Sequence, residues 1–327
     1  MALTSRTYVN PVGAKPIVMG DPFAWQHAGN YYLTGTTDPE AGFRGYRSAN
    51  LVDWTETGWL WRRQPDSWVD GRLWAPEVCA WRGKFYLTYS GTLRGVAPMR
   101  MLMGLAVSDH PEGPYRDLRT PWFDPGYSTI DGHLFIDDDD TPYLYFSRNG
   151  SRDGYDYGIL YGVRLSEDLL TPVGEPIRLM EADQPWETEI RDWNRCNEGA
   201  AVIRVGSHYA MTYSANHYMH ASYGIGAATA PHPLGPWTKD PANPIVSSDP
   251  AVGASGPGHN SIVWSPDRSE RFMVYHAHAD PTQPSDRRVV YIDRLDSDPD
   301  TGRLSLRGPT RSPQAWPRGV GGEVSAG

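Results

Sequence analysis

The chain repeats one short pattern five times, and this repetition limits its fold more than any other feature of the sequence. Each copy starts with a polar residue at a turn, continues through a short apolar run and a second turn, and ends in a run rich in tyrosine or phenylalanine. The copies cover residues 21–37, 75–92, 131–149, 197–216 and 258–278. Two β-rich runs separated by turn residues are typical of a β-hairpin, so each copy predicts one hairpin.

A second, looser hairpin is predicted after each copy, at residues 46–54, 104–115, 162–172, 226–237 and 291–304. Two hairpins make four strands, and four strands repeated five times are typical of a β-propeller. We therefore predict an all-β fold, a five-bladed β-propeller that forms a single domain over residues 1–327, with a partly irregular tail over about 308–327. The start of the chain is expected to add a strand to the last blade. A β-sandwich of short strands with a small extra domain is the alternative.

The composition narrows the classes of partner. The chain has 39 acidic and 30 basic residues and a formal net charge of −9, so neither nucleic acid nor a membrane is an expected partner. Two cysteines, Cys79 and Cys196, cannot build a disulfide framework or a four-cysteine zinc site. The first ten residues contain no apolar signal-peptide region. We expect a cytoplasmic monomer, or a secreted protein if a signal peptide has been removed.

The polar residues that start the five copies would meet at one place in a propeller, because the first strand of each blade lines the central channel. These residues are Asp21, Glu77, Asp131, Glu198 and His259. Gathering four carboxylates in a partly dry site is costly unless they perform chemistry or hold a cation. Paired carboxylates suit the hydrolysis of a glycosidic bond, in which an acid protonates the leaving oxygen and a base activates water. The sequence therefore predicts an active site at the mouth of the central channel.

The motifs around these residues resemble those of glycoside hydrolase family 43. The matching segments are Gly20-Asp21-Pro22-Phe23, Trp74-Ala75-Pro76-Glu77, Ile130-Asp131-Gly132-His133 with Phe135-Ile136-Asp137, Asn197-Glu198-Gly199, Gly256-Pro257-Gly258-His259, and Arg288 before Tyr291-Ile292-Asp293-Arg294. The resemblance covers nearly the whole chain. This sequence has Asp-Gly at Asp131 where Asp-Pro is common, and Glu-Gly-Ala at Glu198 where Glu-Gly-Pro is common, but neither change removes a carboxylate.

The resemblance implies a five-bladed propeller and inverting hydrolysis of arabinose- or xylose-containing glycans. By motif match, Asp21 is the general base, Glu198 is the general acid, and Asp131 orients the acid and raises its pKa. His259 matches a histidine that commonly stands beside a bound water or a calcium ion. No cofactor is expected to be required, and a structural calcium ion in the central channel, held by His259 through water, is a secondary expectation.

Six side chains are expected to contact the substrate: Phe23, Trp74, Glu77, His259, His276 and Arg288. The alternative is a core position for Trp74, a structural role for Glu77, and a surface position beside Arg287 for Arg288. His276 and His278 share one face of a strand, and with His259 they would offer a three-histidine zinc site. Contact of a histidine with substrate hydroxyls is favoured over that zinc site.

The predicted activity is that of an α-L-arabinofuranosidase, with a β-xylosidase and an arabinanase as alternatives. The loop over residues 183–195, which contains Trp186 and Trp193, is expected to wall the pocket and to favour exo cleavage of oligosaccharides. A non-catalytic glycan-binding propeller is the alternative from another class, but it has no need of converging carboxylates. A sialidase-type propeller would need repeated Ser-x-Asp-x-Gly-x-x-Trp boxes, of which Ser265-Pro266-Asp267 is only a fragment.

Overall fold

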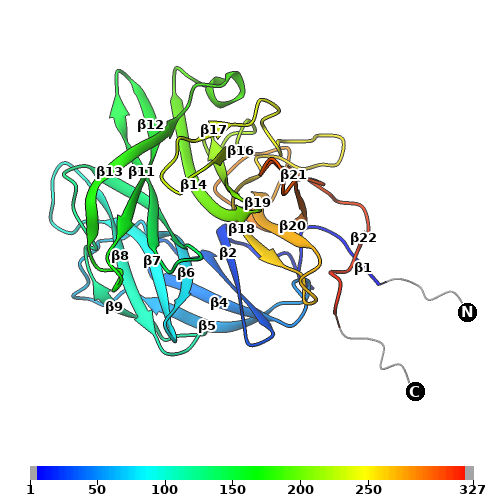
Figure 1. The fold of residues 1–327 in the computed structure, drawn as a ribbon, viewed down its shortest axis with the longest axis horizontal. Coiled ribbons are helices and arrows are strands. Elements are labelled where there is room, and N and C mark those ends of the chain that lie inside the picture. The colour runs from blue at the N-terminus through cyan, green and yellow to red at the C-terminus, as the bar shows by residue number, and fades with distance from the viewer. Residues whose placement is uncertain (1–5, 321–327) are drawn as a thin grey trace, which may run out of the picture.

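The computed structural model describes residues 6–320 and contains almost only β-strands. Within this range, the one helix is a single 3-10 turn, η1, at Pro185–Thr188. None of the helical structure in residues 6–320 is long and apolar enough to cross a membrane. The fold is therefore all-β, as the sequence predicts, and the chain is arranged as several sheets around one centre (Figure 1).

Twenty strands follow one another as five antiparallel groups of four, which we call groups 1 to 5. Group 1 has β2 (Gly20–His27), β3 (Asn30–Thr36), β4 (Gly42–Ser48) and β5 (Thr55–Arg62). Group 2 has β6 (Trp74–Trp81), β7 (Lys84–Thr92), β8 (Met101–Ser108) and β9 (Arg116–Arg119). Group 3 has β10 (Ser128–Ile136), β11 (Pro142–Arg152), β12 (Tyr155–Leu165) and β13 (Pro172–Glu181).

Group 4 has β14 (Asn194–Val205), β15 (His208–Ala215), β16 (Gly224–Ala230) and β17 (Thr238–Lys239). Group 5 has β18 (Gly258–Trp264), β19 (Arg271–His278), β20 (Arg288–Ser297) and β21 (Leu304–Leu306). Groups 3 and 4 form one eight-stranded sheet, because the start of β12 pairs in parallel with the start of β14 at Asp156–Asn194. The remaining groups are separate four-stranded sheets.

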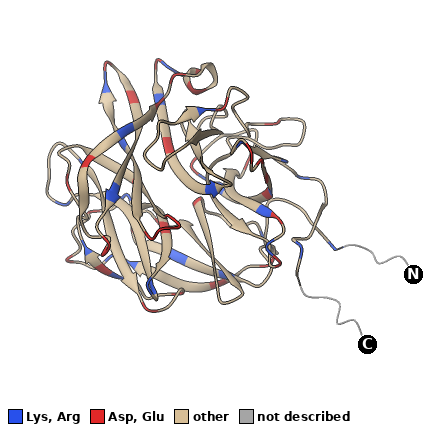
Figure 2. Ribbon diagram, viewed as in Figure 1, with Lys and Arg blue, Asp and Glu red and all other residues tan. Residues whose placement is uncertain are grey.

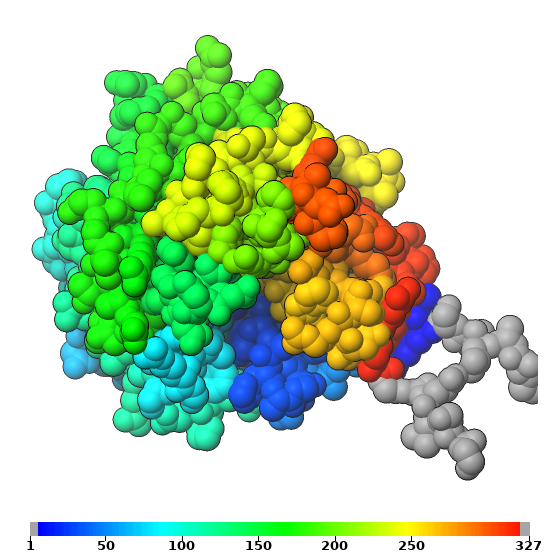
Figure 3. Space-filling model, in the orientation of Figure 1, coloured from blue at the N-terminus to red at the C-terminus, as the bar shows by residue number. Residues whose placement is uncertain are grey.

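The apolar core is divided into five clusters, and each cluster lies between two neighbouring groups. Four clusters join groups 1 and 2, 2 and 3, 3 and 4, and 4 and 5. The fifth joins group 5 to group 1, where Phe272 and Val274 pack with Tyr31 and Leu33. Figure 3 shows the same order, since the colours run from blue through green and yellow to orange and return beside blue.

The first strands of the five groups contact one another in sequence, β2 with β6, β6 with β10, β10 with β14, β14 with β18, and β18 with β2. Each of them has a bulge near its start, where one residue adopts a left-handed backbone conformation. The left-handed residues are Asp21 (φ 51°), Ala75 (44°), Asp131 (59°), Gly199 (60°) and His259 (42°). The polar residue that heads the copy is the bulge residue in three groups, whereas Glu77 lies two residues after the bulge residue and Glu198 one residue before it.

Side chains at the ends of the second strands hold the bulge residues. The backbone N–H of Ala75 donates to Thr36 Oγ1 (2.9 Å), and that of Asp131 donates to Ser90 Oγ (3.0 Å). The N–H of His259 donates to Ser214 Oγ (2.7 Å). These bonds fix the starts of β6, β10 and β18 against the preceding group, so the backbone itself positions the side chains near these bulges.

The two ends of the described chain meet at group 5 (Figure 1). β1 (Thr7–Tyr8) pairs with β22 (Gln314–Ala315), and the N–H of Val12 donates to the carbonyl of Val290 on β20. The start of the chain thus adds backbone hydrogen bonds to β20, but within residues 6–320 it does not add the predicted strand to group 5, because β1 pairs with β22 in a separate two-stranded sheet. The tail is irregular apart from β22 over residues 308–320, and its last part, 321–327, lies outside the described residues.

Asn10 fixes the start of the chain against β20. Its side chain is 2% exposed, its Nδ2 donates to the carbonyl of Ile292 (2.9 Å) and its Oδ1 accepts from the N–H of Ile292 (2.9 Å). Basic and acidic residues are distributed over all parts of the ribbon, without one region that carries a single sign of charge (Figure 2).

We expect Asn10→Ala to lower the free energy of unfolding by about 2 kcal/mol, because the buried N–H of Ile292 loses its partner and the carbonyl of Ile292 keeps only the hydroxyl of Tyr8. Urea denaturation of the variant would measure this change. The control is Asn30→Ala, whose side chain bonds to Arg47 in an exposed setting and should cost much less. Equal stability of the two variants would contradict the role given to Asn10.

Candidate active site

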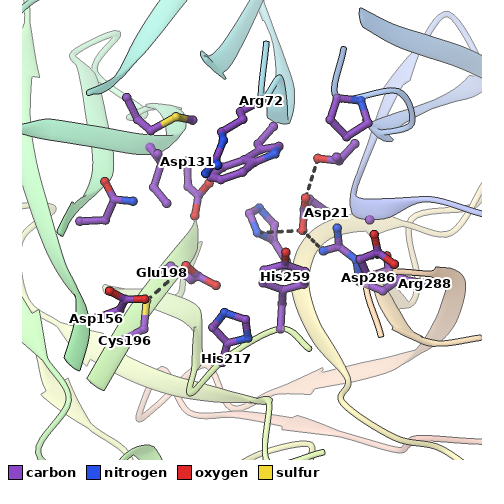
Figure 4. A pocket seen from close by; sticks show the side chains of 18 of the residues that line it. Asp21, Arg72, Asp131, Asp156, Cys196, Glu198, His217, His259, Asp286 and Arg288 are labelled. Carbon is purple, nitrogen blue, oxygen red and sulfur yellow. Dashed lines mark hydrogen bonds and ion pairs between the residues drawn. The ribbon is translucent and has the colours of Figure 1, made fainter. Parts of the chain in front are cut away.

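A cavity of about 760 Å³ opens where the first strands begin. Asp21, Asp131, Glu198 and His259 all line it, each from a different group of strands. In Figure 4 Asp21 and Arg288 lie on one side of the cavity, and Glu198, Cys196 and Asp156 lie on the other. The carboxylates that the sequence predicts to converge are therefore brought together, with the exception of Glu77.

Asp21 is held as an anion. Arg288 Nη1 donates to its Oδ1 (2.7 Å), Thr36 donates to its Oδ2, and His259 Nδ1 lies 3.5 Å from Oδ1. Burial would raise the pKa of Asp21, but the positive charge of Arg288, together with His259, His276 and Thr36, holds that pKa well below its usual range. A buried carboxylate of this kind stays ionised and can accept a proton from water.

Gly20 makes room for this ion pair. A Cβ atom added at Gly20 would lie 2.1 Å from Arg288 Nη2 and 2.2 Å from Cζ, so the guanidinium group passes directly over the glycine. Arg288 comes from β20, and its Cζ lies 4.8 Å from the centre of the Tyr218 ring. The guanidinium is therefore confined between the backbone of β2 and an aromatic ring.

The electrostatic surroundings of Asp131 are the opposite of those of Asp21. It is 5% exposed, and neither a hydrogen bond nor an ion pair of its carboxyl group occurs among the described residues. Burial raises the pKa of Asp131, and the neighbouring carboxylates of Glu198, Asp21 and Glu77 raise it further, although His259 opposes them. The cavity thus holds one carboxyl group that stays ionised and another that retains its proton to a higher pH.

Glu198 is held at both oxygens. The hydroxyl of Tyr223 donates to Oε1 (2.7 Å), and the thiol of Cys196 donates to Oε2 (3.2 Å). Burial, the charge of Glu198 and the hydrogen bond to it raise the pKa of the Cys196 thiol, so it remains a donor. Tyr223 also stacks on His276, with ring centres 5.7 Å apart and planes inclined by 6°. Tyr223 was not foreseen, since an isolated tyrosine in an apolar run gives no signal of its own.

The predicted substrate contacts divide into two sets. Trp74, His259 and Arg288 line the cavity, whereas Phe23, Glu77 and His276 do not. Glu77 is 4% exposed and its Oε2 lies 2.7 Å from His133 Nδ1. Phe23 packs against the cluster between groups 1 and 2. Their positions favour a structural role over direct contact with a ligand.

His276 is fully buried and supports Asp21 from behind. Its Nδ1 accepts the backbone N–H of Asp21 (3.0 Å). Burial and the nearby Arg288 hold the pKa of His276 well below its usual range, so this ring is neutral. By contrast, Asp21, Asp131, Glu77 and Glu198 together raise the pKa of His259 against the effect of burial.

The residues around His259 do not fit a metal bound directly by side chains. Among residues 6–320, no group of three or more histidine, cysteine, aspartate or glutamate side chains is arranged to hold a metal ion. The three-histidine zinc arrangement is therefore not formed in this part of the chain. A calcium ion bound by His259 through water stays a prediction.

Comparison with known proteins identifies the family. The sequence profile of the glycosyl hydrolases family 43 matches residues 8–301. The chain belongs to glycosyl hydrolase family 43. This family 43 enzyme is similar in structure to a thermostable family-43 glycoside hydrolase, with a TM-score of 0.90 and 42% identity over 95% of this chain and 99% of the other.

Two characterised relatives of the family 43 enzyme differ in the activity that their names give. A β-D-galactofuranosidase of Aspergillus niger is 28% identical over 90% of this chain and 84% of its own length. An extracellular exo-α-(1→5)-L-arabinofuranosidase of Streptomyces avermitilis is 27% identical over 84% of this chain, which spans 57% of that protein. The family is thus shared, whereas the identity of the sugar differs between relatives.

We expect Gly20→Ala to reduce kcat/KM of the family 43 enzyme by about ten-fold to a hundred-fold, because the new methyl group displaces the Arg288 guanidinium from Asp21. Steady-state kinetics of Gly20→Ala, Arg288→Met and the double variant would measure this effect. If Gly20 acts through Arg288, the double variant should be no worse than Arg288→Met alone. Full activity of Gly20→Ala would contradict this interpretation of Gly20. A double variant that combines the full losses in kcat/KM of both single variants would contradict it as well.

Proposed function

We propose that this enzyme is an inverting α-L-arabinofuranosidase that releases L-arabinofuranose from arabinose-containing oligosaccharides or side chains. The observation that carries the proposal is the pair of unlike carboxyl sites in one cavity. Asp21 is held as an anion by Arg288, while Glu198 stands across the cavity beside the buried carboxyl group of Asp131. An inverting glycosidase needs this combination, an ionised base and a protonated acid on opposite sides of the sugar.

In the proposed reaction, Asp21 accepts a proton from a water molecule as the water oxygen attacks the anomeric carbon. The bond between that carbon and the glycosidic oxygen breaks at the same time, and Glu198 gives its proton to the departing oxygen. Asp131 assists by its proximity to Glu198, since two carboxyl groups that lie close together in a buried site do not both ionise, and the pair therefore retains a proton. Tyr223 and Cys196 orient the Glu198 carboxyl group.

We also propose that the five groups of strands are the blades of one closed five-bladed β-propeller that forms a single domain. The support is the order of contacts, in which each first strand touches the next and β18 touches β2. The apolar cluster between groups 5 and 1 completes the same order. A sandwich would leave groups 1 and 5 without this contact.

The choice of arabinofuranose rests on the relatives and on the cavity. The two relatives compared above act, by their names, on furanosides, and the α-L-arabinofuranosyl and β-D-galactofuranosyl rings have the same arrangement of ring substituents. The cavity of about 760 Å³ has the size of a small-molecule site, which suits a short oligosaccharide. The β-xylosidase and arabinanase activities, and a propeller that only binds glycans, are the alternatives that the experiments below separate.

We expect Glu198→Ala to lower kcat/KM on an arabinobiose by about 10²–10⁴-fold. The loss should be smaller on p-nitrophenyl α-L-arabinofuranoside, because nitrophenolate leaves without a proton. Rates on the matching β-D-galactofuranoside and β-D-xyloside would identify the sugar, and Glu175→Ala, on the outer strand β13, is the control. Faster cleavage of the xyloside would contradict the sugar assignment, and unchanged activity of Glu198→Ala would contradict its role as acid.

The pH profile tests the role of Asp21. Because Arg288 lowers the pKa of Asp21, Arg288→Met should raise that pKa, and the acidic limb of the plot of kcat/KM against pH should move to higher pH. The variant would therefore lose activity at acidic pH values where the wild type is still active. Arg116→Met, a change at an exposed position on β9, should leave the limb in place. An acidic limb that does not move would show that Asp21 is not the base.

A further inference from the structure

Three stacked rings lead from the surface to the cavity. Trp193 lies 4.5 Å from His217 between ring centres, with the planes inclined by 34°, and His217 lies 4.8 Å from Tyr218 with an inclination of 25°. His217 and Tyr218 line the cavity, whereas Trp193 is 46% exposed. An exposed indole that continues a stack into a cavity is unusual, since large aromatic side chains are normally mostly buried.

The other tryptophan of the same loop is different. Trp186, on η1, packs against Tyr213 with ring centres 6.0 Å apart, and its Nε1 donates to Gln184 Oε1 (2.8 Å). It therefore supports the fold behind group 4. Of the two tryptophans in this loop, Trp193 is the exposed one, and its ring contacts His217, which lines the cavity.

The outer two rings of the stack, Trp193 and His217, lie on the side of the cavity where the leaving group must be, whereas Tyr218 continues the stack to Arg288. Trp193 directly precedes β14, which carries Asn194, Cys196 and Glu198. In Figure 4 His217 lies on the same side as Glu198, away from Arg288. Under the proposed function, the acid protonates the leaving oxygen, so the departing part of the substrate passes over this side.

A polar group with free hydrogen-bonding capacity lies next to the stack. Asn194 lines the cavity and is 5% exposed, and its Oδ1 accepts no hydrogen bond from the described residues. A buried amide oxygen without a partner is costly. An aromatic platform beside such an acceptor has the chemistry of a sugar site, because a sugar offers an apolar C–H face and hydroxyl donors.

We propose that Trp193 and His217 form the platform of a subsite for the sugar on the leaving-group side of the scissile bond, with Asn194 as an acceptor for one of its hydroxyl groups. The inference rests on the proposed function, since it uses Glu198 as the acid. It assigns the preference for an oligosaccharide, rather than a simple glycoside, to residues outside the catalytic carboxylates. The subsite should act on KM more than on kcat.

The test compares substrates with and without a second sugar. For Trp193→Ala, we expect KM for an α-(1→5)-linked arabinobiose to rise about ten-fold, while kcat/KM for methyl α-L-arabinofuranoside, which has no leaving-group sugar, stays within about two-fold. Trp193→Phe should recover most of the loss because it retains a ring. Trp59→Ala is the matched control, since Trp59 lies on β5 beneath Arg44. An equal change on both substrates, or none on either, would overturn the subsite.

A binding measurement separates failure of the subsite from failure of the proposed function. Titration calorimetry with arabinobiose and with xylobiose would measure binding by two proteins. One is Glu198→Gln, which retains Trp193, and the other is Glu198→Gln with Trp193→Ala. Weaker binding of a disaccharide to Trp193→Ala, with unchanged binding of the monosaccharide, would support the subsite even if the wild type cleaved no arabinoside. Equal affinities of the two proteins for both disaccharides would overturn the subsite, whichever sugar the enzyme cleaves.

Discussion

The bulge at the start of each first strand is the constraint on which the site depends. A left-handed residue at this point turns the strand into the cavity, and its N–H is bonded to a side chain of the preceding group in four of the five groups. Aspartate and histidine tolerate this backbone better than most residues. The geometry that brings Asp21, Asp131 and His259 together is therefore set by backbone hydrogen bonds before any charge is considered.

The charges then make the three carboxyl groups unequal. Arg288 reaches Asp21 only because Gly20 has no side chain, and the pair holds Asp21 as an anion. Asp131 has burial and like charges around it without a cation of its own, so its pKa moves upward. Packing places Asp21 and Asp131 in one cavity, and a single guanidinium makes Asp21 the anion of the two. The same contrast between neighbouring carboxyl groups is how one site holds an acid and a base together.

Much of this arrangement could be predicted from the sequence, because the repeated pattern of turns and apolar runs predicts the order of the strands. The all-β fold and the placement of Asp21, Asp131, Glu198 and His259 at one cavity followed from that repeat. The position of Glu77 relative to the bulge of β6 could not be predicted, because the bulge residue is Ala75 and not the carboxylate. Tyr223 and Asn194 were not found either, since their importance comes from contacts between groups that are distant in the chain.

If Asp21 activates water for a single displacement, hydrolysis must invert the configuration of the anomeric carbon, and the configuration of the first product shows whether it does. Proton NMR recorded during the first minutes of hydrolysis of an α-L-arabinofuranoside would show the anomer before it equilibrates. The account predicts that β-L-arabinofuranose forms first, because water attacks from the face opposite the leaving group. Initial formation of the α-anomer would contradict it, since retention requires a covalent intermediate and a carboxylate that acts as the nucleophile.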